Sequence, residues 1–139
     1  MAFPQVNYLA VLASGLAIFI LGGLWYSPAL FAKPWMSLQG VTEEELKAKS
    51  QGSMPALYVQ AFITGVVQAW AMAVILNHFV NLTFLRAALV GVLCWAGFAA
   101  ATSYATAIFS QKPRQLWLID SAFNLVSFVL AGIILAAWR

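Results

Sequence analysis

Residues 22–35 read GGLWYSPALFAKPW, and here a long apolar run gives way to aromatic residues, two prolines and a lysine. Trp and Tyr side chains favour the headgroup level of a bilayer, and neither Pro28 nor Pro34 is expected to extend a regular helix. Gly22 and Gly23 let the end of a helix approach its neighbours closely. The segment is therefore predicted to be the point at which a first helix leaves a membrane.

The composition of the whole chain also indicates a membrane location. Of 139 residues, 63% are apolar and 8% are charged, which leaves too few charges to coat a soluble domain. The basic residues are scattered singly or in pairs, so no basic face for nucleic acid is expected. Cys94 is the single cysteine and lies in an apolar run, where it is expected to pack between helices. The predicted partner is the lipid bilayer, and not nucleic acid.

Four apolar runs are long enough to cross a bilayer. They predict an all-α, polytopic membrane protein with a single domain, residues 1–139, whose first run is retained because no basic residue precedes it. A short amphipathic helix is predicted in the loop after the first span, where Thr42 and Glu45 have the spacing of a capping box. The predicted spans are residues 5–27, 56–78, 84–109 and 115–138, and the loop helix is residues 43–51.

The basic residues are unevenly divided between the two sets of loops. Only Arg86 and Arg139 belong to the side that carries the termini, and the others belong to the first and third loops. By the positive-inside rule, the first and third loops are predicted to be cytoplasmic and both termini to lie outside. The basic residues of the first and third loops are Lys33, Lys47, Lys49, Lys112 and Arg114.

Two of the predicted membrane exits resemble each other. Residues 26–34 match residues 104–113 with one inserted residue, and both segments follow a helix of the same predicted direction. We interpret this as a tandem pair of helical hairpins, as in transporters built from parallel repeats, with chance similarity as the alternative. The alignment places Gln60 and Thr64 opposite Asp120 and Asn124.

Asp120 is the acidic residue inside an apolar run, about 7 Å from the cytoplasmic end of its helix at the usual helical rise. An intramembrane carboxylate is a candidate functional group. The alternative is an anchor that is favoured by the helix dipole and reaches Lys112, Arg114 or water. Other polar side chains fall at comparable depth, where interhelical hydrogen bonding is their alternative role. The candidate polar pocket comprises Asp120, Asn124, Gln60, Thr64, Tyr26, Ser103 and Thr106.

No nucleophile and base at catalytic spacing, no metal-ligand set and no phosphate-binding loop is found in the sequence. We therefore predict no catalytic residue, no metal and no cofactor. Aromatic residues near the ends of the spans are predicted to anchor the protein at the membrane interface. These predicted anchors are Trp25, Tyr26, Trp35, Trp117 and Trp138.

Several segments resemble the uncharacterised bacterial membrane family known as domain of unknown function 1761. They are distributed over nearly the whole chain, and the first glycine-tryptophan-tyrosine-serine-proline segment is the most specific of them. The resemblance implies one four-helix membrane domain in a bacterial inner membrane, and it implies no activity. The segments include Asn7, Gly22–Pro28, Trp95–Phe98, Ile119–Asp120 and Gly132–Trp138.

Two classes of function remain open from the sequence. The first is a non-catalytic assembly or accessory subunit that packs against copies of itself or a larger membrane complex. Gly97, Ala101 and Ala105 favour this class, because small residues at four-residue spacing permit close helix contact. The second is an oligomeric small-solute or proton-linked transporter that uses Asp120, although Asp120 is shallower than such sites usually are. An enzyme acting on a lipid is disfavoured because no catalytic constellation is present.

Overall fold

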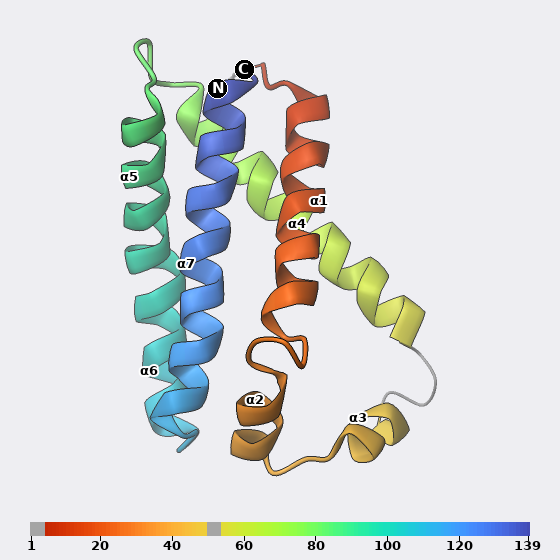
Figure 1. Ribbon diagram of the computed structural model, residues 1–139. Coiled ribbons are helices and arrows are strands. Elements are labelled where there is room, and N and C mark those ends of the chain that lie inside the picture. Colours follow the sequence, from red (N-terminus) through yellow and green to blue (C-terminus); the bar gives the residue numbers. More distant parts are fainter. Residues whose placement is uncertain (1–4, 50–53) are drawn as a thin grey trace.

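The computed structural model describes residues 5–49 and 54–139, which consist of helices and connecting loops (Figure 1). Four stretches are long and apolar enough to cross a membrane, and the third of them is Phe84–Phe109. The predicted all-α fold with four spans is thus confirmed. The elements are α1 (Tyr8–Trp25), α2 (Ala32–Gln39), α3 (Glu43–Lys49), α4 (Met54–Leu76), α5 (Phe84–Cys94), a π-helix (Trp95–Ala100), α6 (Ala101–Phe109) and α7 (Arg114–Ala137).

The loop helix α3 begins where the sequence predicts it. The backbone N–H of Glu45 donates to Oγ1 of Thr42 (3.1 Å), and the backbone N–H of Thr42 donates to Oε2 of Glu45 (3.4 Å). These two bonds satisfy donors that a helix N-terminus otherwise leaves free, so the capping box is confirmed. The predicted end of this helix includes residues 50 and 51, which lie outside the described residues.

A second loop helix, α2, lies where the sequence predicted only a loop. The expectation that Pro34 would not extend a helix is wrong, because Pro34 lies in the first turn of α2. A proline there removes no helical hydrogen bond, since the first N–H groups of a helix have no intrahelical acceptor. Gly40 ends α2 in the left-handed conformation (φ 71°), which favours glycine. Helix α2 is in contact with α7.

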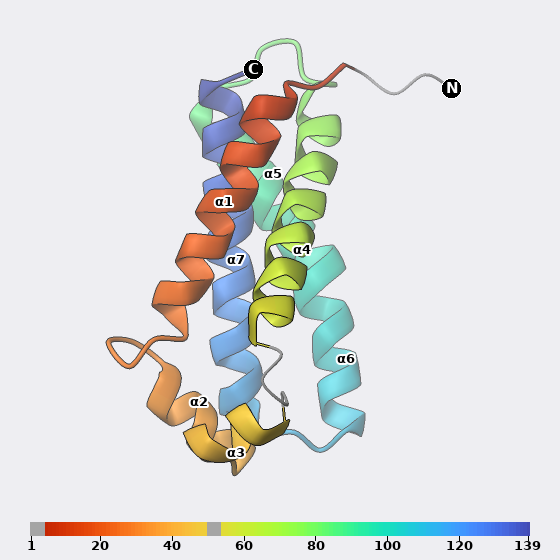
Figure 2. The same cartoon turned by 90° about the vertical axis from the view of Figure 1, so that its right-hand side faces the viewer.

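Helix α7 is the central element of the bundle, with α1, α4 and α5 packed around it (Figures 1 and 2). The most extensive helix contacts are those of α1 with α4 and of α5 with α7, the neighbours expected in two hairpins. Glycines permit both: a Cβ on Gly15 would lie 2.5 Å from Cγ2 of Val66, and one on Gly132 would lie 2.7 Å from the Ala87 oxygen. The helix backbones therefore pack closer than larger residues allow.

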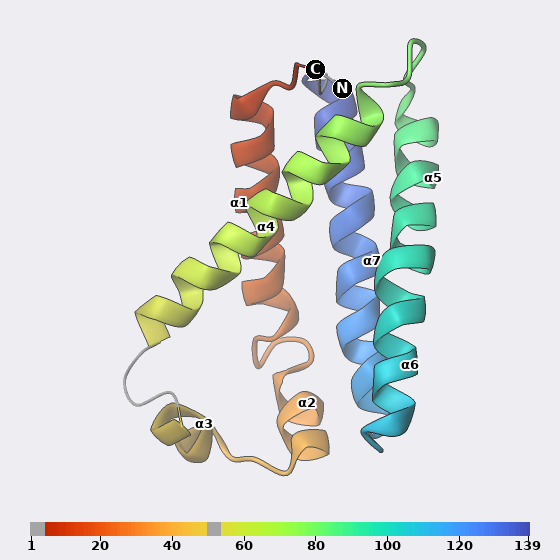
Figure 3. The same cartoon turned by 180° about the vertical axis from the view of Figure 1, so that it is seen from behind.

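The two ends of the bundle differ in polarity. We call the end that carries α2, α3 and the α6–α7 turn the loop end, and the end where α1 begins and α7 finishes the terminal end (Figure 1). Buried apolar side chains such as Val11, Met72, Leu76 and Leu135 fill the terminal end. Toward the loop end, α4 diverges from α6 and α7 (Figure 3). The cavities described below open in this half.

The third span is interrupted by a π-helical turn, which the sequence did not predict. Its first residue, Trp95, donates from Nε1 to the backbone oxygen of Ser121 (2.8 Å). Gly97 lies in the same turn, and no described atom lies within 4 Å of the position of a Cβ there. Gly97, Ala101 and Ala105 are all exposed, so the close helix contact expected of them is not made within the described chain.

Candidate functional site

Asp120 lies near the start of α7, close to the loop end. Its Oδ1 accepts a hydrogen bond from Oη of Tyr26 (2.6 Å) and a second from Nε1 of Trp35 (3.2 Å). Tyr26 directly follows α1 and Trp35 lies in α2, so one carboxyl oxygen joins three elements. Both donors are uncharged. The phenol of Tyr26 donates through its O–H, and the indole of Trp35 donates through its N–H.

Two further indoles donate to the backbone on either side of Asp120. Nε1 of Trp25 donates to the Ile119 oxygen (3.1 Å), and Nε1 of Trp95 donates to the Ser121 oxygen (2.8 Å). Tryptophans away from water usually find a partner for this N–H. The segment 119–121 is therefore held by donors from α1, α2 and the π-helix. This bonding fixes the rotation of α7 around its own axis at the site.

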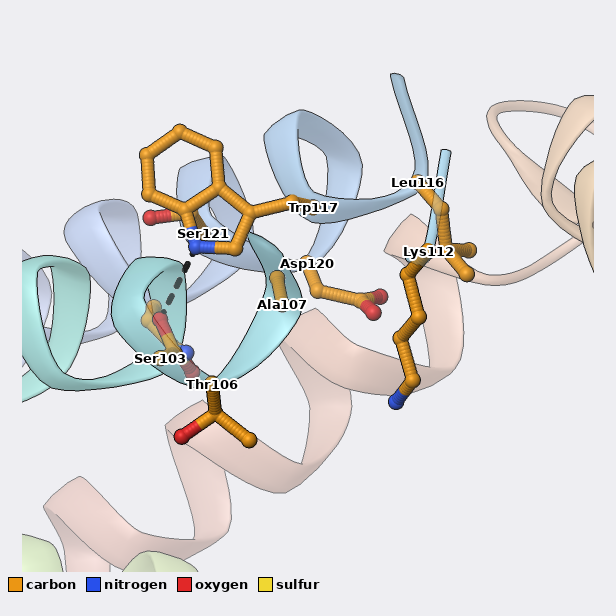
Figure 4. A pocket seen from close by; sticks show the side chains of 9 residues that line it. Ser103, Thr106, Ala107, Lys112, Leu116, Trp117, Asp120 and Ser121 are labelled. Carbon is orange, nitrogen blue, oxygen red and sulfur yellow. Dashed lines mark hydrogen bonds between the residues drawn. The ribbon is translucent and has the colours of Figure 1, made fainter. Parts of the chain in front are cut away.

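A cavity of about 300 Å³ lies between α6 and α7 beside Asp120 (Figure 4). We call it the Asp120 cavity. Nε1 of Trp117 donates to Oγ of Ser103 (3.0 Å) across one side of it. Lys112, from the α6–α7 turn, lies on the opposite side of the view in Figure 4. The cavity is lined by Ser103, Thr106, Ala107, Lys112, Leu116, Trp117, Asp120, Ser121 and Asn124.

Several polar groups around the Asp120 cavity have no hydrogen-bond partner among the described residues. Ser121 is 3% exposed, and its Oγ has no hydrogen-bond partner in the described chain. Among the described residues, no hydrogen bond reaches Oδ2 of Asp120 or the side-chain amide of Asn124. Buried polar groups in native proteins are nearly always satisfied. Oδ2 of Asp120 and the Asn124 amide are therefore candidates to bind a ligand or water, whereas protein atoms cover the Ser121 hydroxyl.

The charges in the cavity also remain apart. Asp120 and Lys112 both line it, yet their charged atoms do not come within the 4.0 Å of an ion pair in this structure. Of the contacts expected for an anchoring Asp120, namely Lys112, Arg114 or water, neither basic residue forms an ion pair with it among the described residues. Tyr26 and Trp35 hold the carboxyl group in their place.

The structure brings four of the seven predicted pocket residues into the Asp120 cavity: Asp120, Asn124, Ser103 and Thr106. Thr64 instead lines a second cavity of about 590 Å³ between α1 and α4, as do Tyr26 and Asn124. Gln60 is exposed on α4 and lines neither cavity. The expectation that Gln60 and Thr64 share one pocket with Asp120 is thus not met in this structure, although Asn124 lies between the two cavities.

Three residues line the cavity that the sequence does not place in the predicted pocket, namely Lys112, Trp117 and Ser121. Trp117 lies three positions before Asp120 and Asn124 lies four positions after it, so both share its helix face. Ser121 directly follows Asp120 and lies on a different face. A search along that face would have found Trp117. No periodic signal marks Ser121, because its inclusion depends on where α6 packs. Trp25, Trp35 and Trp117 were predicted as interface anchors, and here their N–H groups donate inside the protein.

No group of three His, Cys, Asp or Glu side chains that could hold a metal occurs in residues 5–49 and 54–139. The fold and the cavity together define a polytopic helical membrane protein with a polar site at one end of its bundle. The chain belongs to the family described as "Protein of unknown function (DUF1761)", whose model matches residues 9–136. The resemblance seen in the sequence is thereby confirmed over nearly the whole chain. No curated protein and no solved structure matches the chain.

Proposed function

We propose that the protein is a non-enzymatic carrier for a small polar solute, with its binding site open toward the loop end. One observation supports this above the others. Tyr26 and Trp35 donate to one oxygen of Asp120, and Asp120 also lines a cavity of about 300 Å³. The carboxyl group is thus oriented by the protein and still has an oxygen to offer a ligand. An ionisable side chain placed in this way within a span is characteristic of a functional site.

The packing at the other end of the bundle supports a carrier rather than an open channel. Val11, Met72 and Leu76 are each at most 2% exposed, and they fill the core between the site and the terminal end. A site that is open to one side and closed to the other is the arrangement that alternating access requires. The depth of Asp120 places the site nearer the loop end than the midplane, where carrier sites usually lie.

We further propose that the loop end faces the cytoplasm of a bacterium, with the protein in the inner membrane. Lys33, Lys112 and Arg114 all belong to the loop end, and the positive-inside rule places such loops in the cytoplasm. This orientation means that the solute reaches the Asp120 cavity from the cytoplasmic side in the described state.

Cysteine labelling from each side of the membrane tests the carrier proposal. In a Cys94→Ala background, Asn124→Cys is treated with a membrane-impermeant trimethylammonium thiosulfonate in right-side-out and in inverted vesicles. We expect rapid reaction from the loop end and slower reaction from the terminal end, because a carrier exposes its site to both sides in turn. Reaction from one side only, or from neither, would contradict a carrier.

Matched positions report whether the vesicles are sealed and oriented. Ser110→Cys lies in the α6–α7 turn and must react at the loop end only. Val80→Cys, whose native side chain is 92% exposed in the α4–α5 turn, must react at the terminal end only. Leu93→Cys, on the outer face of α5 and 72% exposed, faces lipid and must react from neither side.

The outer face of the third span favours a second function, assembly with other copies or with a larger membrane complex. Gly15, Gly65, Gly91 and Gly132 all lie against neighbouring helices of the same chain, but no described atom faces Gly97. Gly97, Ala101 and Ala105, which we call the small-residue face, are free to admit another helix just as closely. We propose that copies of the protein associate here.

The size of the protein in a mild detergent and in lipid nanodiscs tests this assembly. We expect the wild-type protein to be a dimer or larger, and Ala101→Leu to be monomeric because a larger side chain separates the helices. Ala56→Leu, at an exposed position of α4, is the control and leaves the size unchanged. A wild-type monomer in both detergent and nanodiscs would remove the assembly proposal and leave the carrier proposal untouched.

A further inference from the structure

Opposite charges line the Asp120 cavity without neutralising each other. Asp120 belongs to α7, whereas Lys112 belongs to the α6–α7 turn, and both are lining residues. Figure 4 shows the Lys112 side chain extending past the carboxyl group, and no ion pair joins them within the 4.0 Å that defines one. Asp120 is partly buried, whereas Lys112 is exposed. The cavity therefore presents one charge of each sign to a ligand.

The position of Lys112 follows from the turn that carries it. The preceding residue, Gln111, has φ 56°, and the backbone N–H of Lys112 donates to the Ala107 oxygen (3.2 Å). Both features set the direction of the chain between α6 and α7. Lys112 also lines a neighbouring hollow of about 200 Å³ together with Arg114. The mouth of the cavity is thus basic, whereas Asp120 makes its wall acidic.

Asn124 adds an acceptor to the wall of the cavity. It lies one turn further along α7 than Asp120 and is also a lining residue. The Ser121 hydroxyl is covered by protein atoms, so it is not an acceptor for a ligand in the cavity. An ammonium group has three N–H donors and no acceptor. Asp120 and Asn124 together supply oxygens that match those donors.

We infer that the ligand of the Asp120 cavity is a zwitterion that carries an ammonium group and an anionic group a few bonds apart. The ammonium group binds Asp120 and the side-chain oxygen of Asn124, and the anionic group binds Lys112 at the mouth. This inference rests on the solute site proposed above and names the chemical class of its ligand. A cavity of about 300 Å³ is at the small end of the range for ligand sites and suits such a compact molecule.

Two sources supply this chemistry at the level of the membrane surface. One is a free amino acid, and the other is the ethanolamine phosphate headgroup of a phospholipid. Both have an ammonium group and an anionic group close together. A single positive or negative charge would leave either Lys112 or Asp120 without its counter-charge. The test must therefore separate zwitterions from singly charged molecules, and free solutes from lipids.

Calorimetry on the full chain in phosphatidylglycerol nanodiscs, which contain no zwitterionic lipid, makes both separations. The probes are L-alanine, propionate, which lacks the ammonium group, and ethylamine, which lacks the carboxylate. We expect L-alanine to bind about tenfold or more tightly than either analogue, since each lacks one charged contact. Asp120→Asn keeps an oxygen for Tyr26 and Trp35 and so keeps the fold, but together with Lys112→Met it should lose this binding. Lys33→Met, on the exposed surface of α2, should not.

If the ligand is the headgroup of a phospholipid, the same protein gives a different result. L-alanine then produces no heat, and protein extracted from mixed bilayers retains phosphatidylethanolamine over phosphatidylglycerol, a preference that Asp120→Asn abolishes. Equal binding of L-alanine and a singly charged analogue would overturn the inference of a zwitterionic ligand but would be consistent with the proposed solute site. Binding of none of the three probes, with no lipid preference, would overturn the inference as a whole. Labelling of Asn124→Cys from both membrane sides tests the carrier independently of either outcome.

Discussion

Tyr26 and Asp120 are 94 positions apart, and a hydrogen bond of 2.6 Å runs from Oη of the first to Oδ1 of the second. This bond connects the end of the first span to the fourth span at the level where the Asp120 cavity opens. Trp35 donates to the same oxygen (3.2 Å), so α2 is held against α7 by the same acceptor. The loop end of the bundle is thus organised around a single carboxyl group.

Removing the Tyr26 hydroxyl should weaken the fold. Tyr26→Phe keeps the ring contacts with Trp35 and Phe123 but removes a hydrogen bond to a carboxyl oxygen, at a cost of about 1 to 2 kcal/mol. Reversible unfolding in mixed micelles measures this change. Tyr58→Phe is the control, because the Tyr58 ring packs on Phe19 and its hydroxyl makes no hydrogen bond with the described residues. Equal losses for the two variants would show that the Tyr26–Asp120 bond contributes nothing.

Ser121→Ala should raise stability. The buried Ser121 hydroxyl has no partner in the part of the chain that the structure describes, and removing such a group stabilises by about 1 kcal/mol. L-alanine binding in phosphatidylglycerol nanodiscs should not change, because protein atoms cover this hydroxyl. Ser14→Ala removes a second buried hydroxyl without a described partner, away from the cavity, and should give a similar gain. A loss of stability in either variant would contradict this, and a loss of binding in Ser121→Ala would show that the hydroxyl contacts the ligand.

Gly132 is needed for the close approach of α7 to α5. A Cβ at this position would lie 2.7 Å from the Ala87 oxygen, so Gly132→Ala should cost about 1 to 3 kcal/mol of stability. Gly23→Ala is the matched control, because no described atom lies within 4 Å of its Cβ position. There the better helix propensity of alanine should make the change neutral or stabilising by up to about 1 kcal/mol. Thermal unfolding in one detergent compares the two, and similar effects would contradict the close contact.

Gln111 adopts a backbone conformation that glycine prefers. Its φ is 56°, and a residue with a Cβ is strained there by about 1 kcal/mol. Gln111→Gly should therefore stabilise the protein by roughly that amount, while the α6–α7 turn keeps its shape. Ser110→Gly, in the same turn at φ −78°, should give no gain because any residue adopts that conformation. Denaturation in mixed micelles distinguishes them, and a loss of stability in Gln111→Gly would show that its side chain matters.

The sequence by itself determined the number of membrane spans. Whether a run of apolar residues crosses a bilayer depends on its length and composition, and both are local properties. The capping box of Thr42 and Glu45 is equally local, since its two hydrogen bonds join residues three positions apart. An acid within an apolar run is also a local feature, so the sequence alone identifies Asp120 as a candidate.

Helix α2 and the π-helical turn were decided by the tertiary structure. Residues 32–39 have two features that oppose a helix in isolation, a proline and a short length. The bond from Trp35 to Asp120 and the contact with α7 supply what the segment lacks. The π-helical turn likewise lets Trp95 reach the Ser121 oxygen, a partner that no local pattern indicates.

The grouping of polar residues around Asp120 was also decided by the tertiary structure. Helical periodicity places a residue on a face, but the tilt and rotation of each helix determine what that face meets. Here the close approach at Gly15 and Gly132 sets how α4 and α5 pack. As a result Ser103 and Thr106 line the cavity with Asp120, whereas Gln60 is exposed on α4. The sequence alone therefore determined which residues are chemically able to form a site, and only the packing decided which of them share it.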